Sequence, residues 1–380
     1  MGDTGDGAGR PDPVRPGLRE SIEGRIARLL SHVPGAWLLR LVGERPTVVN
    51  GATLDAHVQF LLAARRRKGD PGMCEPTVTA GRARYRRETA GVAGPLTPVG
   101  RVRELQVDGG AGTLLARHYA PVAAAAERAP LLVYLHGGGF AIGDLETHDE
   151  PCRQLCHHAA MHVLSVAYRL APEHRFPCAV DDAMAALRWA QEHAESLGAD
   201  PSAVGVGGDS AGGNLATVAA LARSRAGCPP VAQLLLYPVT DADVATASRR
   251  LFATGYVLEK RDVDAFRDLY LGDALASRAD PRASPRREGD HSLAPPALVV
   301  TAGYDPLSDE GRDYSESLRL AGVRTEHLHF PPLVHGFAHM TTVVPAARSA
   351  MVQVARRWGE FVAEQRGGGA PPGHRLTPAA

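Results

Sequence analysis

Ser210 stands in the stretch GDSAGGN (208–214), with glycines at positions 208 and 212. The stretch follows an apolar run, AVGVGG (203–208), and precedes a helical segment. A tight strand-to-helix turn with small neighbours lifts a serine hydroxyl above a sheet, where it is exposed for attack on a carbonyl. A glycine-rich turn with a helix-capping serine is the plainer alternative. We predict that Ser210 is a catalytic nucleophile.

A serine hydroxyl needs a neighbouring base, and histidine has the pKa that suits this task. His335, in PLVHGF, lies after the last predicted strand and before the last predicted helix. Serines on turns of this kind are followed along the chain by the acid and then by the histidine, which favours His335. His339, about one helical turn further along, is the alternative base. His327 and His329 lie within the strand and are expected to be structural.

The histidine in turn needs an acid that fixes its tautomer. Asp305 ends an apolar strand in LVVTAGYDPLSDEG and is followed by a proline that stops the strand. Asp309 and Glu310 are the alternatives, but they open a helix, where acids stabilise the positive end of the helix dipole. We therefore predict a triad of Ser210, Asp305 and His335.

The stretch HGGGF (136–140) also follows an apolar run and has no side chain on three consecutive residues. When serine attacks a carbonyl, the oxygen gains a negative charge that backbone N–H groups stabilise. A loop without Cβ atoms brings such N–H groups close to the ester, and the N–H of Ala211 would complete an oxyanion hole. A phosphate-binding loop is the alternative, but its usual patterns need different glycine spacing, and no lysine follows these glycines.

These residues lie at the ends of short apolar runs that alternate with helical patterns from Pro130 onward. The predicted strands are LLVYL (131–135), HVLSVAY (162–168), AVGVGG (203–208), AQLLLY (232–237), PALVVTAG (296–303) and RTEHLHF (324–330). This alternation predicts an α/β fold with a mostly parallel central sheet flanked by helices on both faces. Active sites in such sheets lie at the carboxyl ends of the strands.

The expected organisation of the chain is a disordered N-terminus (1–18), an N-terminal helical cap segment (19–95), a core (96–365) with a cap insertion at about 240–292, and a disordered tail (366–380). Both termini are rich in glycine and proline, which disfavours a packed structure. The segment SIEGRIARLLSHV has apolar residues at helical spacing. A hairpin is predicted around DGGAG, between VRELQV and TLLARHYAP. The insertion shows no strand pattern, and we expect it to pack on the N-terminal helices as a lid.

Composition argues against several other functions. The 380 residues contain 42 Lys and Arg and 42 Asp and Glu, and this balance gives no support for a nucleic-acid or anionic-membrane partner. The five cysteines form no CxxC pair, so packed thiols are favoured over a metal site. Their odd number suits a reducing compartment, and the N-terminus lacks an apolar secretory signal, so we expect a cytoplasmic protein. No continuous apolar run predicts a membrane span.

Together these motifs resemble those of the bacterial hormone-sensitive-lipase family, GDSAG subgroup, whose members are carboxylesterases of the α/β-hydrolase fold. The matching stretches are HGGGF (136–140), GDLETHD (143–149), YRLAPEHRFP (168–177), GDSAGGN (208–214), DPLSDEG (305–311) and HGF (335–337). The resemblance covers roughly residues 54–363. It implies the following site: the triad Ser210, Asp305 and His335; an oxyanion hole of Gly138, Gly139 and Ala211; and supporting roles for His136, Gly137, Asp209 and Tyr168.

The resemblance implies a serine ester hydrolase that acts on short to medium acyl esters through an acyl-enzyme intermediate. It implies no metal and no organic cofactor, and many members form homodimers. An amidase, lactonase or deacetylase using the same triad is the alternative. Plant gibberellin receptors resemble the family but lack the catalytic histidine, so His335 argues against a ligand-binding role of that kind. Aromatic residues make up only 5% of the chain, and the predicted cap shows no charged cluster, which favours a neutral acyl chain of modest size.

Overall fold

The computed structural model describes residues 18–69, 72–92, 94–122, 128–272 and 275–367. The two termini that were expected to be disordered lie outside these residues, except at their inner edges. There Leu18 begins the first helix, and the last helix extends to Gly367.

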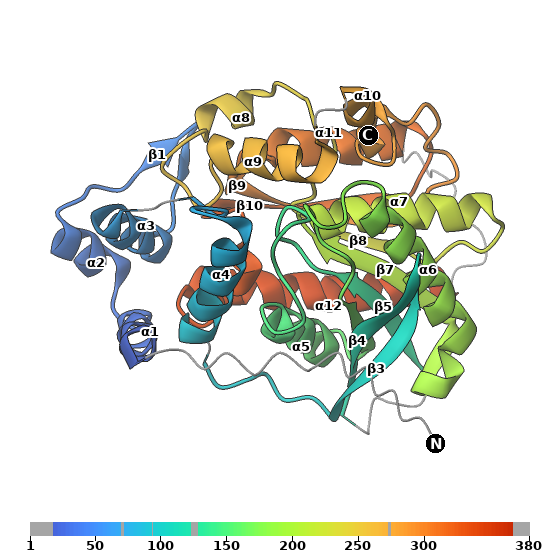
Figure 1. Ribbon diagram of the computed structural model, residues 1–380. Helices are drawn as coiled ribbons and strands as arrows, with labels where there is room; N and C mark the ends of the chain where they lie inside the picture. Colours follow the sequence, from blue (N-terminus) through green and yellow to red (C-terminus); the bar gives the residue numbers. More distant parts are fainter. Residues whose placement is uncertain (1–17, 70–71, 93, 123–127, 273–274, 368–380) are drawn as a thin grey trace, which may run out of the picture.

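An eight-stranded sheet forms the centre of the molecule (Figure 1). Its strands are β3 (Arg101–Gly109), β4 (Gly112–Ala120), β5 (Ala129–Leu135), β6 (His162–Val166), β7 (Ala199–Asp209), β8 (Gln233–Leu236), β9 (Ala297–Tyr304) and β10 (Thr325–Val334). Their order in the sheet is β10-β9-β8-β7-β5-β6-β4-β3. The β3–β4 and β4–β6 pairs are antiparallel, and the other neighbours are parallel. The predicted α/β fold with its hairpin and mostly parallel sheet is confirmed.

Helices cover both faces of this sheet (Figure 1). One face carries α6 (Cys178–His193), α7 (Ala211–Arg225) and α11 (Ser308–Leu320), and the other carries α5 (Asp149–His158) and α12 (Pro345–Gly367). Alternate residues of β5 divide between two hydrophobic clusters. Leu131, Val133 and Leu135 pack with α6 and α7, whereas Leu132 and Tyr134 pack with α5 and α12. Burial on both faces explains why the parallel strands are almost continuously apolar.

Four helices precede the sheet: α1 (Leu18–Leu30), α2 (Gly35–Val42), α3 (Ala56–Lys68) and α4 (Val78–Val92). Between α2 and α3 the structure adds a feature that the helical reading of this segment missed. Strands β1 (Val48–Val49) and β2 (Ala52–Thr53) form a small antiparallel ribbon. Asn50 and Gly51 join them with φ of 50° and 78°, and Asn-Gly is the residue pair that favours such a turn.

The insertion between β8 and β9 contains α8 (Ala247–Leu251), α9 (Lys260–Leu271) and α10 (Leu275–Ala279), and no strand occurs in its described residues. It contacts the N-terminal segment, as expected for a lid. Phe266 of α9 belongs to a hydrophobic cluster against which Met73 and Tyr85 pack. The backbone N–H of Met73 also donates to Asp262 Oδ1 at 2.7 Å. The exact bounds of the cap remain a prediction.

None of the helices in the described ranges combines the length and the apolar character needed to cross a bilayer.

Candidate active site

Ser210 lies at the sharp turn between β7 and α7. Its φ of 53° and ψ of −115° are strained for a residue with a side chain, as expected of a nucleophile elbow. A Cβ atom on Gly208 would lie 2.3 Å from the carbonyl oxygen of Leu135, and one on Gly212 would lie 1.8 Å from the same oxygen. The two glycines of the motif are therefore needed because β5 passes directly beside the turn.

Ser210, His335 and Asp305 form a continuous chain of hydrogen bonds. His335 Nε2 lies 3.0 Å from Ser210 Oγ, and His335 Nδ1 lies 2.9 Å from Asp305 Oδ2. Because an ionised carboxylate only accepts, Nδ1–H donates to Asp305, and Nε2 is left to accept from the serine hydroxyl. All three side chains are buried. The structure thus brings the three predicted residues together from three strand ends far apart in sequence; their catalytic roles remain predictions.

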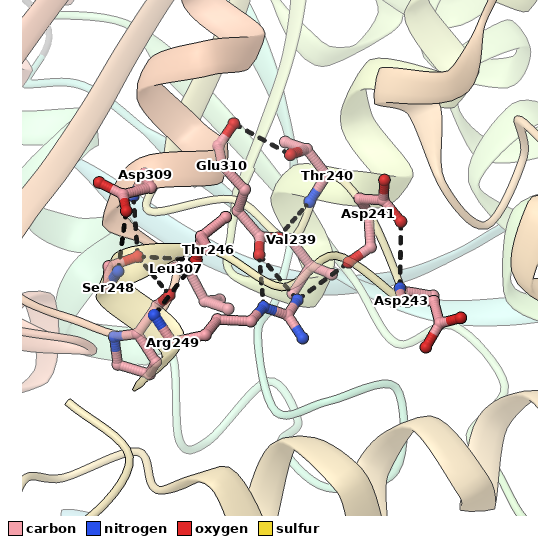
Figure 2. Close-up of polar contacts among 12 residues, drawn as sticks. Val239, Thr240, Asp241, Asp243, Thr246, Ser248, Arg249, Leu307, Asp309 and Glu310 are labelled. Carbon is pink, nitrogen blue, oxygen red and sulfur yellow. Dashed lines mark hydrogen bonds and ion pairs between the residues drawn. The ribbon is translucent and has the colours of Figure 1, made fainter. Parts of the chain in front are cut away.

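The alternative residues face elsewhere. Asp309 Oδ2 accepts from the backbone N–H of Ser248 at 2.8 Å, and Glu310 pairs with Arg249 at 2.7 Å (Figure 2). His339 lies with its Nε2 3.6 Å from Asp209 Oδ2. None of the three takes part in the hydrogen bonds between Ser210, His335 and Asp305.

The loop of residues 137–140, named here the oxyanion loop after its predicted role, follows β5. Gly138 and Gly139 have φ of 114° and 59°, in the region that favours glycine. Among the described residues, no hydrogen-bond acceptor lies against the N–H groups of Gly138, Gly139 or Ala211. The N–H of Gly137 differs, since it donates to Asp209 Oδ1 at 2.8 Å. Three N–H groups near the nucleophile therefore have hydrogen-bonding capacity left for a ligand.

His136 and Tyr168 lie behind this loop rather than in it. The Tyr168 hydroxyl donates to the carbonyl of His136 at 2.7 Å, and the two rings stack with centroids 4.3 Å apart. His136 Nδ1 lies 2.8 Å from the carbonyl of Gly137. Burial lowers the pKa of His136 to about 4, and neighbouring His148 adds to the effect. His136 is therefore neutral at pH 7 and packs behind the loop; its supporting role remains a prediction.

Asp209 connects the nucleophile strand to the oxyanion loop. Its Oδ1 accepts from the Tyr134 hydroxyl at 2.8 Å, in addition to the N–H of Gly137. Burial alone would raise the pKa of Asp209, but interactions with His148 and His339 outweigh it and hold the pKa well below its usual range. His148 stands in the motif GDLETHD (143–149), but its role is not evident from the sequence.

His148, Asp209 and His339 are also the one group in the described residues whose spacing would suit a metal ion, with ligand atoms within 4.8 Å of one another. Hydrogen bonds already engage these atoms. His148 Nε2 lies 3.3 Å from Asp209 Oδ1 and 3.2 Å from the backbone nitrogen of Gly137, and Nδ1 lies 2.9 Å from Thr147 Oγ1. The geometry therefore fits a cluster that fixes the oxyanion loop.

A cavity of about 270 Å³ opens beside Ser210 and His335. Apolar side chains from both the N-terminal segment and the insertion line it, including Met73, Leu258 and Phe266. Several charged residues also reach its wall. They have partners: Arg249 pairs with Glu310, Arg267 Nη1 lies 2.8 Å from Asp264, and Arg84 Nε lies 3.7 Å from Glu88. The cavity is thus chiefly apolar.

Comparison with known proteins agrees with this geometry. A family model described as the α/β-hydrolase fold matches residues 132–339. The carboxylic ester hydrolase LipN of Mycobacterium tuberculosis is 44% identical over 320 residues, which are 82% of this chain and 84% of LipN. The ethyl acetate hydrolase of Pseudomonas putida is 42% identical over 225 residues, which are 59% of this chain and 70% of that enzyme.

Solved structures give the same result. The ester hydrolase EH1AB1 from the metagenome of Lake Arreo superposes with a TM-score of 0.78 at 39% identity, covering 82% of this chain and 99% of that one. A thermostable esterase from Pseudomonas putida ECU1011 also has a TM-score of 0.78, at 32% identity, covering 83% of this chain and 99% of that one.

Proposed function

This chain belongs to the hormone-sensitive-lipase-like carboxylesterases of the α/β-hydrolase family, and we propose that it works through an acyl-enzyme intermediate on Ser210. The hydrogen-bonded chain Ser210–His335–Asp305 is the observation that carries this mechanism. It lies beside the N–H groups of Gly138, Gly139 and Ala211, for which the described residues provide no acceptor.

In the first half of the reaction, Ser210 Oγ attacks the ester carbonyl while His335 Nε2 takes the hydroxyl proton. The carbonyl oxygen becomes an oxyanion, which the N–H groups of Gly138, Gly139 and Ala211 stabilise; one such donor is typically worth about 3 kcal/mol of barrier. The C–O bond to the alcohol then breaks, and His335 gives its proton to the departing oxygen. Asp305 stabilises the imidazolium and holds its tautomer throughout.

In the second half, water takes the place of the alcohol. His335 removes a proton from the water as it attacks the acyl carbon, the same N–H groups stabilise the second oxyanion, and the proton returns to Ser210 as the acid leaves. Every proton thus moves between Ser210, His335 and the substrate oxygens. This scheme needs no cofactor, which is why we keep the prediction that the enzyme uses none.

The cavity supports a neutral acyl group of short to medium length as the substrate. Its volume of about 270 Å³ is slightly below the usual range of ligand pockets, roughly 300–1,000 Å³. The charged residues on its wall have protein partners, so an ionic acyl group would gain little there. The triad does not define the leaving group of the substrate, because the same three residues can cleave esters, lactones and activated amides.

The test compares the wild type with Ser210→Ala on p-nitrophenyl acetate, butyrate and octanoate, with an anilide and a lactone in the same panel. We expect the wild type to prefer acetate or butyrate, and the variant to lose at least about 10⁴-fold in kcat. A fluorophosphonate should label the wild type and not the variant. Equal rates for the two proteins would contradict the mechanism, and a preference for the anilide or lactone would contradict the substrate class.

We also propose that the enzyme forms a homodimer. Large apolar side chains are exposed on the first two helices: Ile22, Ile26 and Leu29 on α1, and Trp37 and Leu41 on α2. Contact with a second copy of this chain would bury them. Light scattering should give the mass of a dimer for the wild type and of a monomer for Trp37→Arg/Leu41→Arg, with Leu320→Arg on α11 as the exposed control. A monomeric wild type at tens of micromolar would contradict this proposal.

The proposed location is the cytoplasm. All five cysteines are free, and free thiols are typical of a reducing compartment. Fractionation of cells that produce the protein tests this directly, and recovery of the bulk of the enzyme outside the cytoplasmic fraction would contradict it.

A further inference from the structure

We infer that Arg249 and Glu310 are positioning residues of the esterase reaction. Their ion pair fixes the loop that carries Asp305, and so joins the insertion to the triad. Neither residue touches the reacting atoms. The inference rests on the proposed function, since it assigns a task within the same active site.

The ion pair is geometrically specific and lies mostly inside the protein, with 15% of the Arg249 side chain exposed. Arg249 Nε and Nη2 lie 2.8 and 2.7 Å from Glu310 Oε2, and Nη2 also donates to the carbonyl of Asp241 at 2.9 Å (Figure 2). Glu310 is fully buried. Arg249 belongs to α8 of the insertion, whereas Glu310 lies in the first turn of α11, five residues after Asp305. The pair therefore links two segments that are about 60 residues apart in sequence.

Ser248 strengthens the same link by reciprocal hydrogen bonds (Figure 2). Its hydroxyl donates to the carbonyl of Pro306 at 2.8 Å and accepts from the N–H of Asp309 at 3.2 Å. Its own N–H donates to Asp309 Oδ2 at 2.8 Å. Pro306 directly follows Asp305, whose second oxygen, Oδ1, accepts from the N–H of Leu307 at 2.8 Å. The acid is thus held by its own loop, and that loop is held by α8.

The other oxygen of Glu310 reaches toward the nucleophile. Oε1 accepts from the N–H of Thr240 at 2.9 Å, and the Thr240 hydroxyl donates to the carbonyl of Glu310 at 3.1 Å. The preceding residue, Val239, donates its N–H to the carbonyl of Ser210 at 3.1 Å. One carboxylate therefore sets the distance between the segment that carries the acid and the segment that holds the nucleophile.

A buried ion pair is weak evidence for stability, because removing two charges from water offsets much of their attraction. Burial raises the pKa of Glu310, while Arg249 and the N–H of Thr240 act in the opposite direction. The Arg249–Glu310 ion pair and its hydrogen bonds require one arrangement of the two loops. Apolar side chains of the same size would impose no such requirement. Arg249 also lines the acyl cavity, so the residue that anchors the acid loop is part of the cavity wall.

The experiment uses Glu310→Gln, Arg249→Met and Arg249→Lys in the full-length enzyme, with Arg319→Met on the exposed side of α11 as the matched control. Fluorophosphonate titration counts the competent sites, and kcat is given per titrated site well below each melting temperature. We expect Glu310→Gln and Arg249→Met to lower kcat at least tenfold while KM changes less than threefold. Arg249→Lys, which keeps the charge, should recover part of the loss, and Arg319→Met should match the wild type.

A purely structural role predicts a different pattern. The variants would then melt at lower temperature and yield fewer titratable sites, but kcat per site would equal that of the wild type, and this result would overturn the inference. If the charge variants do not fold, Ser248→Ala tests the inference instead, because it removes hydrogen bonds without leaving a buried charge. It should lower kcat about threefold or more, and an unchanged kcat would equally overturn the inference. An inactive wild type would instead refute the proposed function.

Discussion

The carboxylate of Asp209, the residue before Ser210 in sequence, contacts Tyr134, Gly137 and His148. It accepts hydrogen bonds from Tyr134 and Gly137 and so holds the oxyanion loop against the strand that carries Ser210. The sequence predicts a supporting role for Asp209, which remains a prediction, but it does not indicate the contacts of Asp209 with His148 and His339. These contacts join β7 to a helix start and to the loop after β10, and no local pattern encodes such an approach.

The glycines around Ser210 allow a sharp prediction. A Cβ on Gly212 would meet the carbonyl oxygen of Leu135 at 1.8 Å, so Gly212→Ala requires the backbone of β5 or α7 to move. We expect a loss of at least about 3 kcal/mol in the free energy of unfolding, at the upper end of overpacking effects. Urea denaturation followed by circular dichroism measures it.

Gly227→Ala is the matched control for that substitution. Gly227 has a φ of 77° and nothing within 4 Å of the position its Cβ would take, so only backbone strain opposes the change, at about 1–2 kcal/mol. Equal losses for the two variants would show that the contact with Leu135 is not what keeps residue 212 a glycine.

At the scale of elements, the sheet could be predicted because buried parallel strands are almost continuously apolar. All six apolar runs after Pro130 are strands, and the hairpin before them is present. The ribbon β1–β2 was not predicted because its strands are only two residues long, although the pair Asn50-Gly51 is typical of such a turn. Helices α8 and α10 have five residues each, too few to show a helical period.

The placement of α9 over the oxyanion loop could not be predicted either. The ring of Phe266 lies where a Cβ on Gly139 would be, at a distance of 2.1 Å, and 127 residues separate the two in sequence. Gly139 is therefore small for two reasons: its positive φ and the ring that lies against it. The pairing of the glycine loop with the insertion depends on tertiary packing alone.

This packing makes Phe266 a determinant of acyl size. Phe266→Ala should enlarge the cavity and move the preferred p-nitrophenyl ester toward longer chains by at least two carbons, at a cost of about 3–5 kcal/mol in stability. The measurement is kcat/KM across a series from acetate to decanoate. Phe252→Ala is the control, because Phe252 lies in the same insertion but packs on Tyr256 and Tyr304. A parallel shift in both variants would mean that general loosening of the insertion sets the preference.

At the scale of the whole molecule, buried neutral histidines tie stability to pH. Burial lowers the pKa of His118 to about 3, with His162 adding to the effect, and that of His136 to about 4. Both lie below the ordinary value of about 6.5. The unfolded chain therefore binds more protons than the folded one below pH 6.5, and the free energy of unfolding must fall as the pH drops from 6.5 toward 4.

We expect urea denaturation to show full stability at pH 8 and a loss of about 2–5 kcal/mol at pH 4.5. His118→Gln should reduce this pH dependence, since it removes one of the two groups. An unfolding midpoint that is the same at pH 8 and pH 4.5 would contradict the assignment of neutral histidines. An unchanged dependence of the unfolding free energy on pH in His118→Gln would also contradict this assignment.

Strand β10 forms one edge of the sheet, with β9 as its only partner in the described sheet, and His335 directly follows it. Its outer side is contacted by the segment before α3, where the N–H of Asp55 donates to the carbonyl of Pro332 at 2.9 Å. Edge elements open at lower free energy than central strands. In rising urea, ester hydrolysis should therefore disappear before the far-ultraviolet circular dichroism signal does, so the enzyme would lose its base while most of its fold persists. Coincident curves would show that β10 and the central strands unfold as one cooperative unit.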